Sequence, residues 1–295
     1  MKVLVTGGSG FVGSHLSREL ASRGHEVTAL SRSPDGEELP DAVETVTGDV
    51  TEYDSLVDPI DGQDVVVNLV ALSPLFKPKG GDEMHRKIHL EGTRNVIRAA
   101  EAGGVSAIVQ MSALGADPEG ATAYIRAKGR AETVVQESDL AWTIVRPSVI
   151  FGDGSEFLKF TRTLTTPYVT ALPAGGSTRF QPIWIGDLAP MLADCVESET
   201  HRGQIYDIGG PEALSLADVA RLLYEAEGKS LSVIPVPMSL TEIGMNLADP
   251  LSFVPFGRDQ YRSLQFDNTT AENDISAFDL EPADLLSLAE YIEST

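Results

Sequence analysis

The sequence predicts an α/β fold, with a doubly wound parallel sheet, helices on both faces and a small C-terminal lobe. Two observations carry this prediction. Short apolar, β-branched segments alternate with amphipathic segments through the first half of the chain, as in right-handed βαβ crossovers. A glycine-rich turn that begins at Gly7 joins the first apolar segment to the first amphipathic one. At 295 residues the chain is long enough for one such unit and an appended lobe.

The first half supplies the regular elements in order. Residues 65–70 are apolar apart from Asn68, which is typical of a strand covered on both faces. We expect strands at 2–6, 26–30, 43–47, 64–71, 105–111 and 141–146, and helices near 11–22, 52–58, 82–102 and 122–138. This alternation predicts a first domain at residues 1–150.

The pattern loosens after Arg146-Pro147, where Gly, Pro, Thr and Phe become frequent. Beyond it we expect strands at 180–185 and 204–208, helices opened by Asp187 and capped by Ser215, a short helix near 239–247 and an acidic helix near 282–293. These elements predict a second domain at 151–295, which completes the sheet and forms the substrate lobe.

The glycine-rich turn predicts a dinucleotide site of the Rossmann type. Gly7, Gly10 and Gly13 follow a strand and open a helix, where glycine permits a tight turn and close approach of a pyrophosphate. Free N–H groups at the helix N-terminus favour that phosphate. The alternative is a strand-to-helix turn without a ligand. The expected contacts are Thr6, Gly7, Gly8, Ser9, Gly10, Phe11, Val12 and Gly13.

The end of the second strand favours NADP(H), with NAD(H) as the alternative. An acidic residue there would hold a ribose 2′-hydroxyl, but the chain has Ser31, Arg32 and Ser33, which suit a 2′-phosphate. Arg32 could instead be a solvated loop residue. Further contacts are expected from the ends of the third and fourth strands, at Gly48, Asp49, Val50, Leu69, Val70 and Ala71. Asp49 could accept from the adenine amino group or cap a helix.

The composition restricts the classes of partner. The chain has 22 basic and 44 acidic residues, a net charge of −22 that argues against nucleic-acid binding. Acid spread along the chain with scarce lysine favours a salt-rich cytoplasm, the alternative being an ordinary acidic cytosolic protein. Cys195 is alone, which excludes an intrachain disulfide, and we expect it in a helix core. Without a secretory signal or an apolar run of ~18 residues, we expect a cytoplasmic location.

Five segments together resemble the extended short-chain dehydrogenase/reductases of the NAD-dependent epimerase/dehydratase superfamily. They are Thr6-Gly7-x-x-Gly10-x-x-Gly13, residues 89–96, Tyr124-x-x-x-Lys128, residues 146–152 and residues 181–189. Within that family, residues 111–116, 258–260 and 264–268 are similar to the atypical branch of the 39-kDa accessory subunit of complex I and its free-standing prokaryotic relatives.

The resemblance implies a catalytic Tyr124 with Lys128 as its activator and nicotinamide-ribose ligand. The two residues lie one helical turn apart, so they share a helix face, where a nearby ammonium would lower the pKa of the phenol. Without the other motifs the pair would be read as a solvated face. Ser112 is the candidate to polarise a substrate carbonyl, although the usual position is Ala113; His89 replaces the family's Asn. Pro147 is expected near the cofactor.

The most favoured function is an NADPH-dependent reductase of an apolar carbonyl or quinone-like substrate. The alternatives are a non-catalytic NADPH-binding accessory or assembly protein of a respiratory NADH dehydrogenase, peripherally associated with it, and a nucleotide-sugar epimerase or dehydratase. Arg179 and Arg258 could meet an anionic group or pair with acids. Lobe aromatics and methionines could be core or line an apolar pocket: Phe157, Phe160, Tyr168, Trp184, Met238, Met245, Phe253 and Phe256. The oligomeric state is left open.

Overall fold

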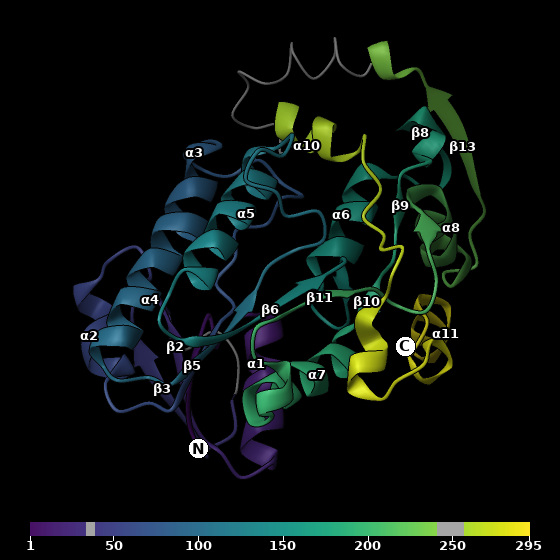
Figure 1. The fold of residues 1–295 in the computed structure, drawn as a ribbon. Coiled ribbons are helices and arrows are strands. Elements are labelled where there is room, and N and C mark those ends of the chain that lie inside the picture. Colours follow the sequence, from purple (N-terminus) through teal and green to yellow (C-terminus); the bar gives the residue numbers. More distant parts are fainter. Residues whose placement is uncertain (34–38, 241–256) are drawn as a thin grey trace. The chain divides into compact units, whose positions relative to one another are not determined.

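The computed structural model describes residues 1–33, 39–240 and 257–295, which form two units (Figure 1). The first unit contains Met1–Leu72, Glu83–Arg146 and Ile185–Asp207, and the second contains Ser73–Asp82, Pro147–Trp184 and Ile208–Thr295. The break after Arg146 lies close to the expected division at residue 150. Two segments, 73–82 and 185–207, fall on the other side of that expected division.

A seven-stranded sheet forms the centre of the first unit, in the order β11-β6-β5-β4-β1-β2-β3. The strands are β1 Lys2–Thr6, β2 Glu26–Ser31, β3 Val43–Thr47, β4 Val65–Asn68, β5 Ala107–Met111, β6 Ala141–Pro147 and β11 Gln204–Ile208. The pairs from β3 through β6 are all parallel. Because the order reverses between β1 and β4, a ligand crevice is expected at their carboxyl ends. The predicted doubly wound sheet is confirmed.

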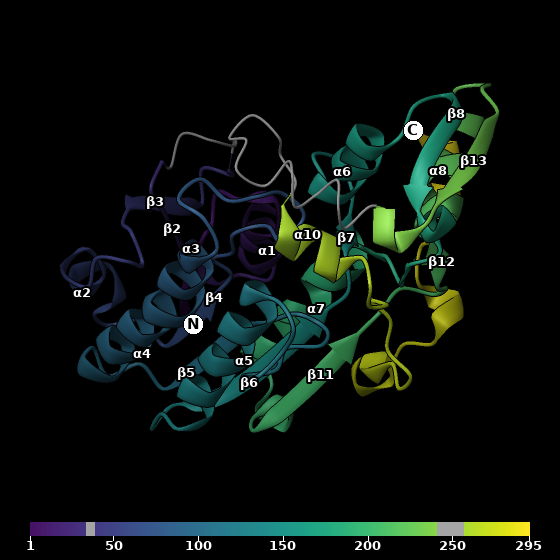
Figure 2. The ribbon, with the colours of Figure 1, turned by 90° about the horizontal axis from the view of Figure 1, so that it is seen from above.

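Helices lie on both faces of this sheet (Figures 1 and 2). They are α1 Phe11–Ser22, α2 Asp54–Ile60, α3 Glu83–His85, a π-helix over Arg86–Glu91, α4 Gly92–Ala102, α5 Ala123–Gln136, α7 Ile185–Glu197 and the 3-10 turn Glu199–His201. Strand residues such as Leu4, Val66 and Ile108 are fully buried in one cluster with Val96 of α4 and Val135 of α5. The continuous apolar strands therefore form the predicted two-sided core.

Helices α1 and α7 are joined by Arg23, at the C-terminal end of α1. Its Nη1 lies 2.6 Å from Asp194 and 2.8 Å from Glu197 of α7, and its Nε lies 2.7 Å from Glu19. Cys195 of the same helix is buried, as expected for a helix-core thiol, and burial raises the pKa of its thiol to about 12.

Three expected boundaries are wrong. β4 ends at Asn68 rather than residue 71: the Leu69 amide still donates to Thr6 O of β1, but residues 69–71 are not part of the strand. The strand expected at 180–185 is two short strands, β9 Arg179–Phe180 and β10 Ile183–Trp184, which pair with different partners. Consequently α7 begins at Ile185, with Asp187 in its first turn rather than at its cap.

The second unit is built from short elements. They are β7 Ile150–Phe151, α6 Glu156–Leu164, β8 Tyr168–Pro173, β9, β10, β12 Leu214–Ser215, α8 Leu216–Glu225, β13 Leu231–Val236, α10 Arg258–Ser263, α11 Leu288–Ser294 and 3-10 turns at Ala174–Gly176, Asp274–Phe278 and Pro282–Asp284. Ser215 caps α8 by accepting from the Asp218 amide, as predicted. The expected acidic helix at 282–293 is instead a 3-10 turn followed by α11, which starts after its cap Ser287.

Several of the lobe aromatics are core, which is one of the two alternatives that the sequence left open. Phe157 and Phe160 are buried, and Trp184 packs against the same cluster. Tyr168 is 60% exposed, whereas Met245, Phe253, Phe256 and most of the helix expected at 239–247 lie outside the described residues. Arg179 pairs with Asp267 at 2.8 Å, in accordance with the acid-pairing alternative.

No helix in the described ranges is both long and apolar enough to cross a membrane. Among the same residues, no group of three or more His, Cys, Asp or Glu side chains could hold a metal ion.

Candidate functional site

The glycine turn folds back on the carboxyl end of β2. The amides of Gly7 and Gly8 both donate to Leu30 O, at 2.8 and 3.2 Å, and the Gly10 amide donates to Gly7 O at 2.9 Å. Gly7 has a φ of +74°, in the left-handed region that favours glycine. The turn is thus held by hydrogen bonds of its own backbone.

Packing requires glycine at positions 8 and 13, whereas a side chain at position 10 would be less crowded. A Cβ on Gly13 would lie 2.7 Å from Gly8 Cα and under 3.0 Å from Gly7 O, and a Cβ on Gly8 would lie 2.6 Å from the Ala29 Cβ. A Cβ on Gly10 would meet only Gly7 O, at 3.2 Å. Packing within the chain therefore explains Gly8 and Gly13, while close approach of a phosphate to Gly10 stays a prediction.

The N-terminus of α1 is suited to an anion. Its cap, Gly10, has no side chain, and the first turn has no acidic residue. Intrahelical bonding begins with the Ser14 amide, which donates to Gly10 O, so the amides of Phe11, Val12 and Gly13 precede it. These amides and the helix dipole fit the pyrophosphate of a dinucleotide.

The end of β2 offers cationic and hydroxyl groups. Arg32 is exposed and makes no ion pair with any residue that the structure describes. The hydroxyl of Ser31 is buried without a hydrogen-bond partner, and Ser9 Oγ donates to Ser33 O at 3.4 Å. The last hydrogen bond brings this end of β2 beside the glycine turn, where a ribose phosphate would lie.

The residues after β3 make contacts within the fold. Asp49 Oδ1 accepts from the Thr51 amide at 2.9 Å, a local turn bond that lies before α2; the cap residue of that helix is Tyr53, so Asp49 does not cap it. Val50 is buried, and a Cβ on Gly92 would lie 2.8 Å from it. A Cβ on Gly48 would lie 2.9 Å from Leu30 Cδ1. An adenine contact of these three residues stays a prediction.

The segment after β4 lies alongside the glycine turn. A Cβ on Gly7 would be 3.4 Å from the Val70 amide nitrogen, and the Leu69 amide donates to Thr6 O at 3.2 Å. Leu69 is buried, Val70 is half-buried and Ala71 is exposed. This places the two loops of the strand-order reversal side by side. Pro147, also expected near the cofactor, ends β6 and belongs to the second unit.

Tyr124 and Lys128 lie on one face of α5, as predicted. Thr122 caps this helix by accepting from the Ile125 amide. Lys128 is 1% exposed; its Nζ donates to Met111 O at 2.9 Å and lies 6.0 Å from the Tyr124 ring centroid. The alternative interpretation of this pair was a solvated helix face. The burial of the Lys128 ammonium near the Tyr124 ring, at the carboxyl end of β5, excludes that interpretation for Lys128.

The expected lowering of the Tyr124 pKa is wrong for this structure. Burial raises the pKa of Tyr124 above its usual value of 10.0. Burial also lowers the pKa of Lys128 to about 8, and its Nζ is engaged by a backbone carbonyl rather than by the phenol. At neutral pH the site therefore holds a neutral phenol beside an ammonium.

Two histidines that the sequence did not single out as a pair cover Tyr124. His85 and His89 stack with ring centroids 5.7 Å apart, and Tyr124 meets both edge-on, at 5.6 and 5.3 Å. His89 lies in the π-helical stretch, a feature frequent at functional sites. Burial, with the charges of Lys128 and His85, holds the pKa of His89 well below its usual range. The spacing of four residues was the sequence signal for this cluster.

Ser112 occupies a closed environment. Its side chain is 3% exposed, its Oγ is buried without a hydrogen-bond partner, and its amide donates to Val145 O. Ala113, the other candidate position, is buried and has no hydroxyl. A carbonyl-polarising role for Ser112 stays a prediction.

A buried chain of hydrogen bonds connects Thr6, just before the glycine turn, to Lys128. Thr6 Oγ1 donates to Asn68 Oδ1 at 2.6 Å, and Asn68 Nδ2 donates to Gln110 Oε1 at 2.8 Å. Gln110 Nε2 donates at 3.1 Å to Met111 O, the carbonyl that also accepts from Lys128. This series of hydrogen bonds crosses β1, β4 and β5. It therefore connects the strand that precedes the glycine turn to Lys128.

A family model described as NAD(P)H-binding matches residues 7–167, more than half of the sequence. The chain belongs to this NAD(P)H-binding family. The match spans the glycine turn and the Tyr124–Lys128 pair, so the NAD(P)H-binding region and the proposed catalytic pair lie in one segment.

Curated relatives and solved structures extend this assignment. The NAD(P)H-binding protein is 30% identical to a chloroplastic divinyl chlorophyllide a 8-vinyl-reductase of Cucumis sativus, over 84% of its own chain and 62% of the relative. It is 25% identical to a mitochondrial NADH dehydrogenase [ubiquinone] 1 alpha subcomplex subunit 9 of Arabidopsis thaliana, over 94% and 73%. The NAD complex of Thermus thermophilus UDP-glucose 4-epimerase shares its fold, with a TM-score of 0.70, 22% identity and coverage of 99% and 97%.

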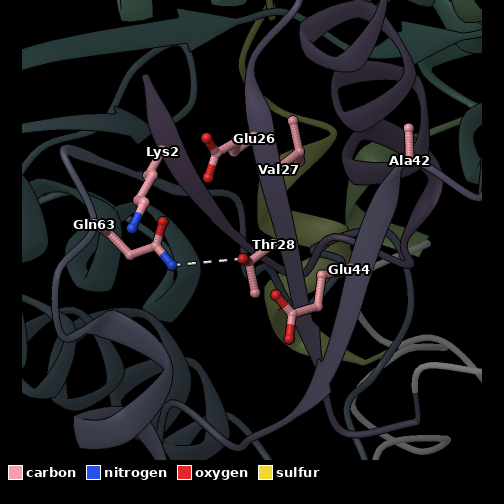
Figure 3. Close-up of a pocket in the computed structure, with 7 residues that line it drawn as sticks. All are labelled: Lys2, Glu26, Val27, Thr28, Ala42, Glu44 and Gln63. Atoms are coloured by element: carbon pink, nitrogen blue, oxygen red, sulfur yellow. Dashed lines mark hydrogen bonds between the residues drawn. The ribbon is translucent and has the colours of Figure 1, made fainter.

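A pocket of about 320 Å³ lies at the opposite edge of the sheet (Figure 3). It is lined by Lys2, Glu26, Val27, Thr28, Ala42, Glu44 and Gln63. These residues come from the amino ends of β1, β2 and β3 and from the turn before β4, whereas the glycine turn follows the carboxyl end of β1. The pocket is therefore separate from the NAD(P)H-binding site.

We expect His89 to make the stability of the NAD(P)H-binding protein sensitive to acid. Because the pKa of folded His89 is below the unfolded value of 6.5, its contribution is fully present above pH 6.5 and is lost as pH falls. We expect the free energy of unfolding to drop by about 1.4 kcal/mol per pH unit just below pH 6, from this residue alone. Urea unfolding at several pH values and high salt should show that the free energy of unfolding falls less steeply with pH in His89→Phe than in the unchanged protein. An equal slope in the two proteins would contradict the role given to His89.

Proposed function

We propose that the chain is an NADPH-dependent reductase of an apolar carbonyl or quinone-like substrate. The observation that carries this proposal is the buried Lys128 beside Tyr124, connected by continuous hydrogen bonds to Thr6 at the dinucleotide turn. If the glycine turn served only the fold, there would be no reason for Lys128 to be buried at the same edge of the sheet. When bound, the nicotinamide supplies the hydride.

Each residue has a defined part in this reaction. The amides of Phe11, Val12 and Gly13 hold the pyrophosphate, and Gly10 lets it approach. Tyr124 donates its proton to the substrate oxygen, and the Lys128 ammonium stabilises the resulting phenolate and binds the nicotinamide ribose. Because burial raises the pKa of Tyr124, the phenol stays protonated at neutral pH, the state that reduction requires.

Arg32 supports a preference for NADPH over NADH. It is exposed beside Ser31 and Ser33 without an ion-pair partner in the described chain, and a guanidinium can form two hydrogen bonds to a 2′-phosphate. A charge-assisted hydrogen bond contributes about 1.5–3 kcal/mol, or roughly 10- to 100-fold in affinity. We expect NADPH to raise the melting temperature much more than NADH at equal concentration.

Arg32→Ala should remove most of that difference while NADH binding stays the same. Arg18→Ala is the control variant, because it also removes one arginine but on helix α1. It should keep the preference for NADPH over NADH. Equal shifts with both cofactors in the unchanged protein would refute the Arg32 argument.

A comparison supports the reaction type, whereas the apolar substrate class is our proposal from the aromatic and methionine residues in the lobe sequence. The Cucumis sativus relative is named as a reductase, which supports hydride transfer rather than cofactor storage. The present chain spans 62% of that relative, so its substrate is not transferred to this protein. We assign a cytoplasmic location, with an apolar substrate taken from solution or from a membrane surface.

A non-catalytic role is the second candidate. The chain aligns over 94% of its length with an NADH dehydrogenase subunit, and Ser112 is buried while Ala113 lacks a hydroxyl. An accessory protein of a respiratory complex would bind NADPH without turnover and would co-purify with membranes. A nucleotide-sugar epimerase, the third candidate, is favoured by the epimerase fold alone.

A further inference from the structure

Three polar side chains lie next to one another across the sheet, one on each of β1, β4 and β5. Thr6 is paired with Asn68, and Asn68 with Gln110, in the register of the parallel strands. Each of the three is at most 3% exposed, so their polar groups must find partners inside the protein. We call Thr6, Asn68 and Gln110 the polar row. Asn68 Nδ2 also donates to Thr93 Oγ1 of α4, at 3.2 Å.

The Met111 carbonyl lies at the end of the polar row, where β4 no longer pairs with β5. β4 ends at Asn68, whose partner in the register is Gln110, so in the described sheet β4 has no residue opposite Met111. Two side chains donate to this carbonyl: Gln110 Nε2 at 3.1 Å and Lys128 Nζ at 2.9 Å. The buried ammonium of Lys128 therefore depends on a carbonyl that the Gln110 amide also holds.

The Met111 carbonyl sets the direction of each hydrogen bond along the polar row. Because a carbonyl only accepts, Gln110 must turn its NH₂ group toward it. The Gln110 oxygen is then left to accept from Asn68 Nδ2 at 2.8 Å. Asn68 in turn directs its own oxygen at Thr6, whose hydroxyl donates at 2.6 Å. A rotation of either amide would bring two acceptors or two donors together, so the row holds Gln110 in one orientation.

We propose that Gln110 is a positioning residue for Lys128: it fixes the Met111 carbonyl, and this carbonyl fixes the lysine ammonium. The proposal rests on the proposed function, in which Lys128 serves the nicotinamide ribose and the Tyr124 phenolate. Both tasks require the ammonium at one place, and a misplacement of about 1 Å at such a site can cost about 100-fold in rate. The position of the lysine is thus set by β5 of the sheet as well as by its own helix α5.

The test is Gln110→Met, which keeps a similar side-chain length and removes the amide. The readout is the Lys128 Nζ signal in ¹H–¹⁵N NMR of the ligand-free protein at low temperature, identified by its loss in Lys128→Met. We expect this signal to shift or to broaden beyond detection in Gln110→Met, because the Met111 carbonyl loses its second donor. An unchanged signal would overturn the proposal.

Thr93→Val is the matched control. It also removes one buried side-chain hydrogen bond of the same network, from Asn68 Nδ2, but this bond does not involve the Met111 carbonyl. The Lys128 signal should stay where it is. A change as large as that in Gln110→Met would overturn the proposal, because any loss of a buried hydrogen bond would then have the same effect.

Gln110→Met leaves Asn68 with one acceptor fewer, and an unpaired buried amide can unfold the protein. The variant Thr6→Val/Asn68→Leu/Gln110→Leu replaces the whole polar row by apolar side chains, which costs less than leaving one member unpaired. It should change the Lys128 signal in the same way, and an unchanged signal in this variant would also overturn the proposal.

NADPH affinity separates this proposal from the proposed function. If both hold, Gln110→Met weakens NADPH binding by roughly 10-fold, the loss expected when a hydrogen bond from a charged group is misplaced, and Thr93→Val keeps the original affinity. If the Lys128 signal changes in Gln110→Met while NADPH affinity stays the same, the role of Gln110 stands and the proposed cofactor role of Lys128 fails.

Discussion

Gly13→Ala is expected to disrupt the dinucleotide turn and nearly abolish NADPH binding. The added Cβ would lie 2.7 Å from Gly8 Cα, 2.9 Å from the Gly7 carbonyl carbon and under 3.0 Å from Gly7 O. All three are backbone atoms, so no side chain can rotate away. Overpacking of this kind costs about 1–3 kcal/mol, and the turn must shift from the geometry that fits a pyrophosphate. Urea unfolding and an NADPH fluorescence titration measure the two effects.

Gly10→Ala is the matched control, since its Cβ would meet only Gly7 O, at 3.2 Å. We expect this variant to lose less stability than Gly13→Ala, because its closest contact is less severe. It should still bind NADPH at least 10-fold more weakly, because the methyl group would lie where the pyrophosphate is proposed to approach. Unchanged NADPH affinity in Gly13→Ala would contradict the packing argument. Unchanged affinity in Gly10→Ala would show that the pyrophosphate does not approach that residue.

The parts of the fold that could be predicted are those set by local pattern. The glycine turn and the apolar strands through β6 can be recognised from neighbouring residues alone. The parallel orientation of these strands follows from the βαβ connections between them. Strands β9 and β10 have two residues each, which is too short to show a pattern of alternating burial. Gln181 and Pro182 separate them, and each strand pairs with a segment distant in sequence. Their existence depends on tertiary contacts that the sequence pattern does not contain.

The shared helix face of the candidate pair was predictable, but its electrostatics were not. The spacing of Tyr124 and Lys128 predicted that they share a face. The raised pKa of Tyr124 depends on burial beside His85 and His89, and their stacking arises in a π-helical stretch that no propensity indicated. The connection from Thr6 through Asn68 and Gln110 joins three strands far apart in sequence, so it too required the structure.

Tyr124→Phe is expected to reduce turnover by about 10²- to 10⁴-fold while NADPH affinity stays the same. Phenylalanine keeps the ring that packs edge-on against His85 and His89 and removes only the hydroxyl that is proposed to donate the proton. NADPH oxidation followed at 340 nm, with 9,10-phenanthrenequinone and an aliphatic ketone as probes, measures turnover. A thermal shift with NADPH measures binding.

Lys128→Met gives the contrast that decides between an enzyme and a cofactor-binding accessory protein. In the enzyme, it should weaken NADPH binding and turnover together, because the ammonium serves the ribose and the phenolate, whereas Tyr124→Phe affects turnover alone. In an accessory protein, the unchanged chain has no turnover on either probe and Tyr124→Phe has no effect, yet Lys128→Met still weakens NADPH binding. The difference between the two variants therefore measures whether the hydroxyl of Tyr124 is used, independently of whether the cofactor is bound.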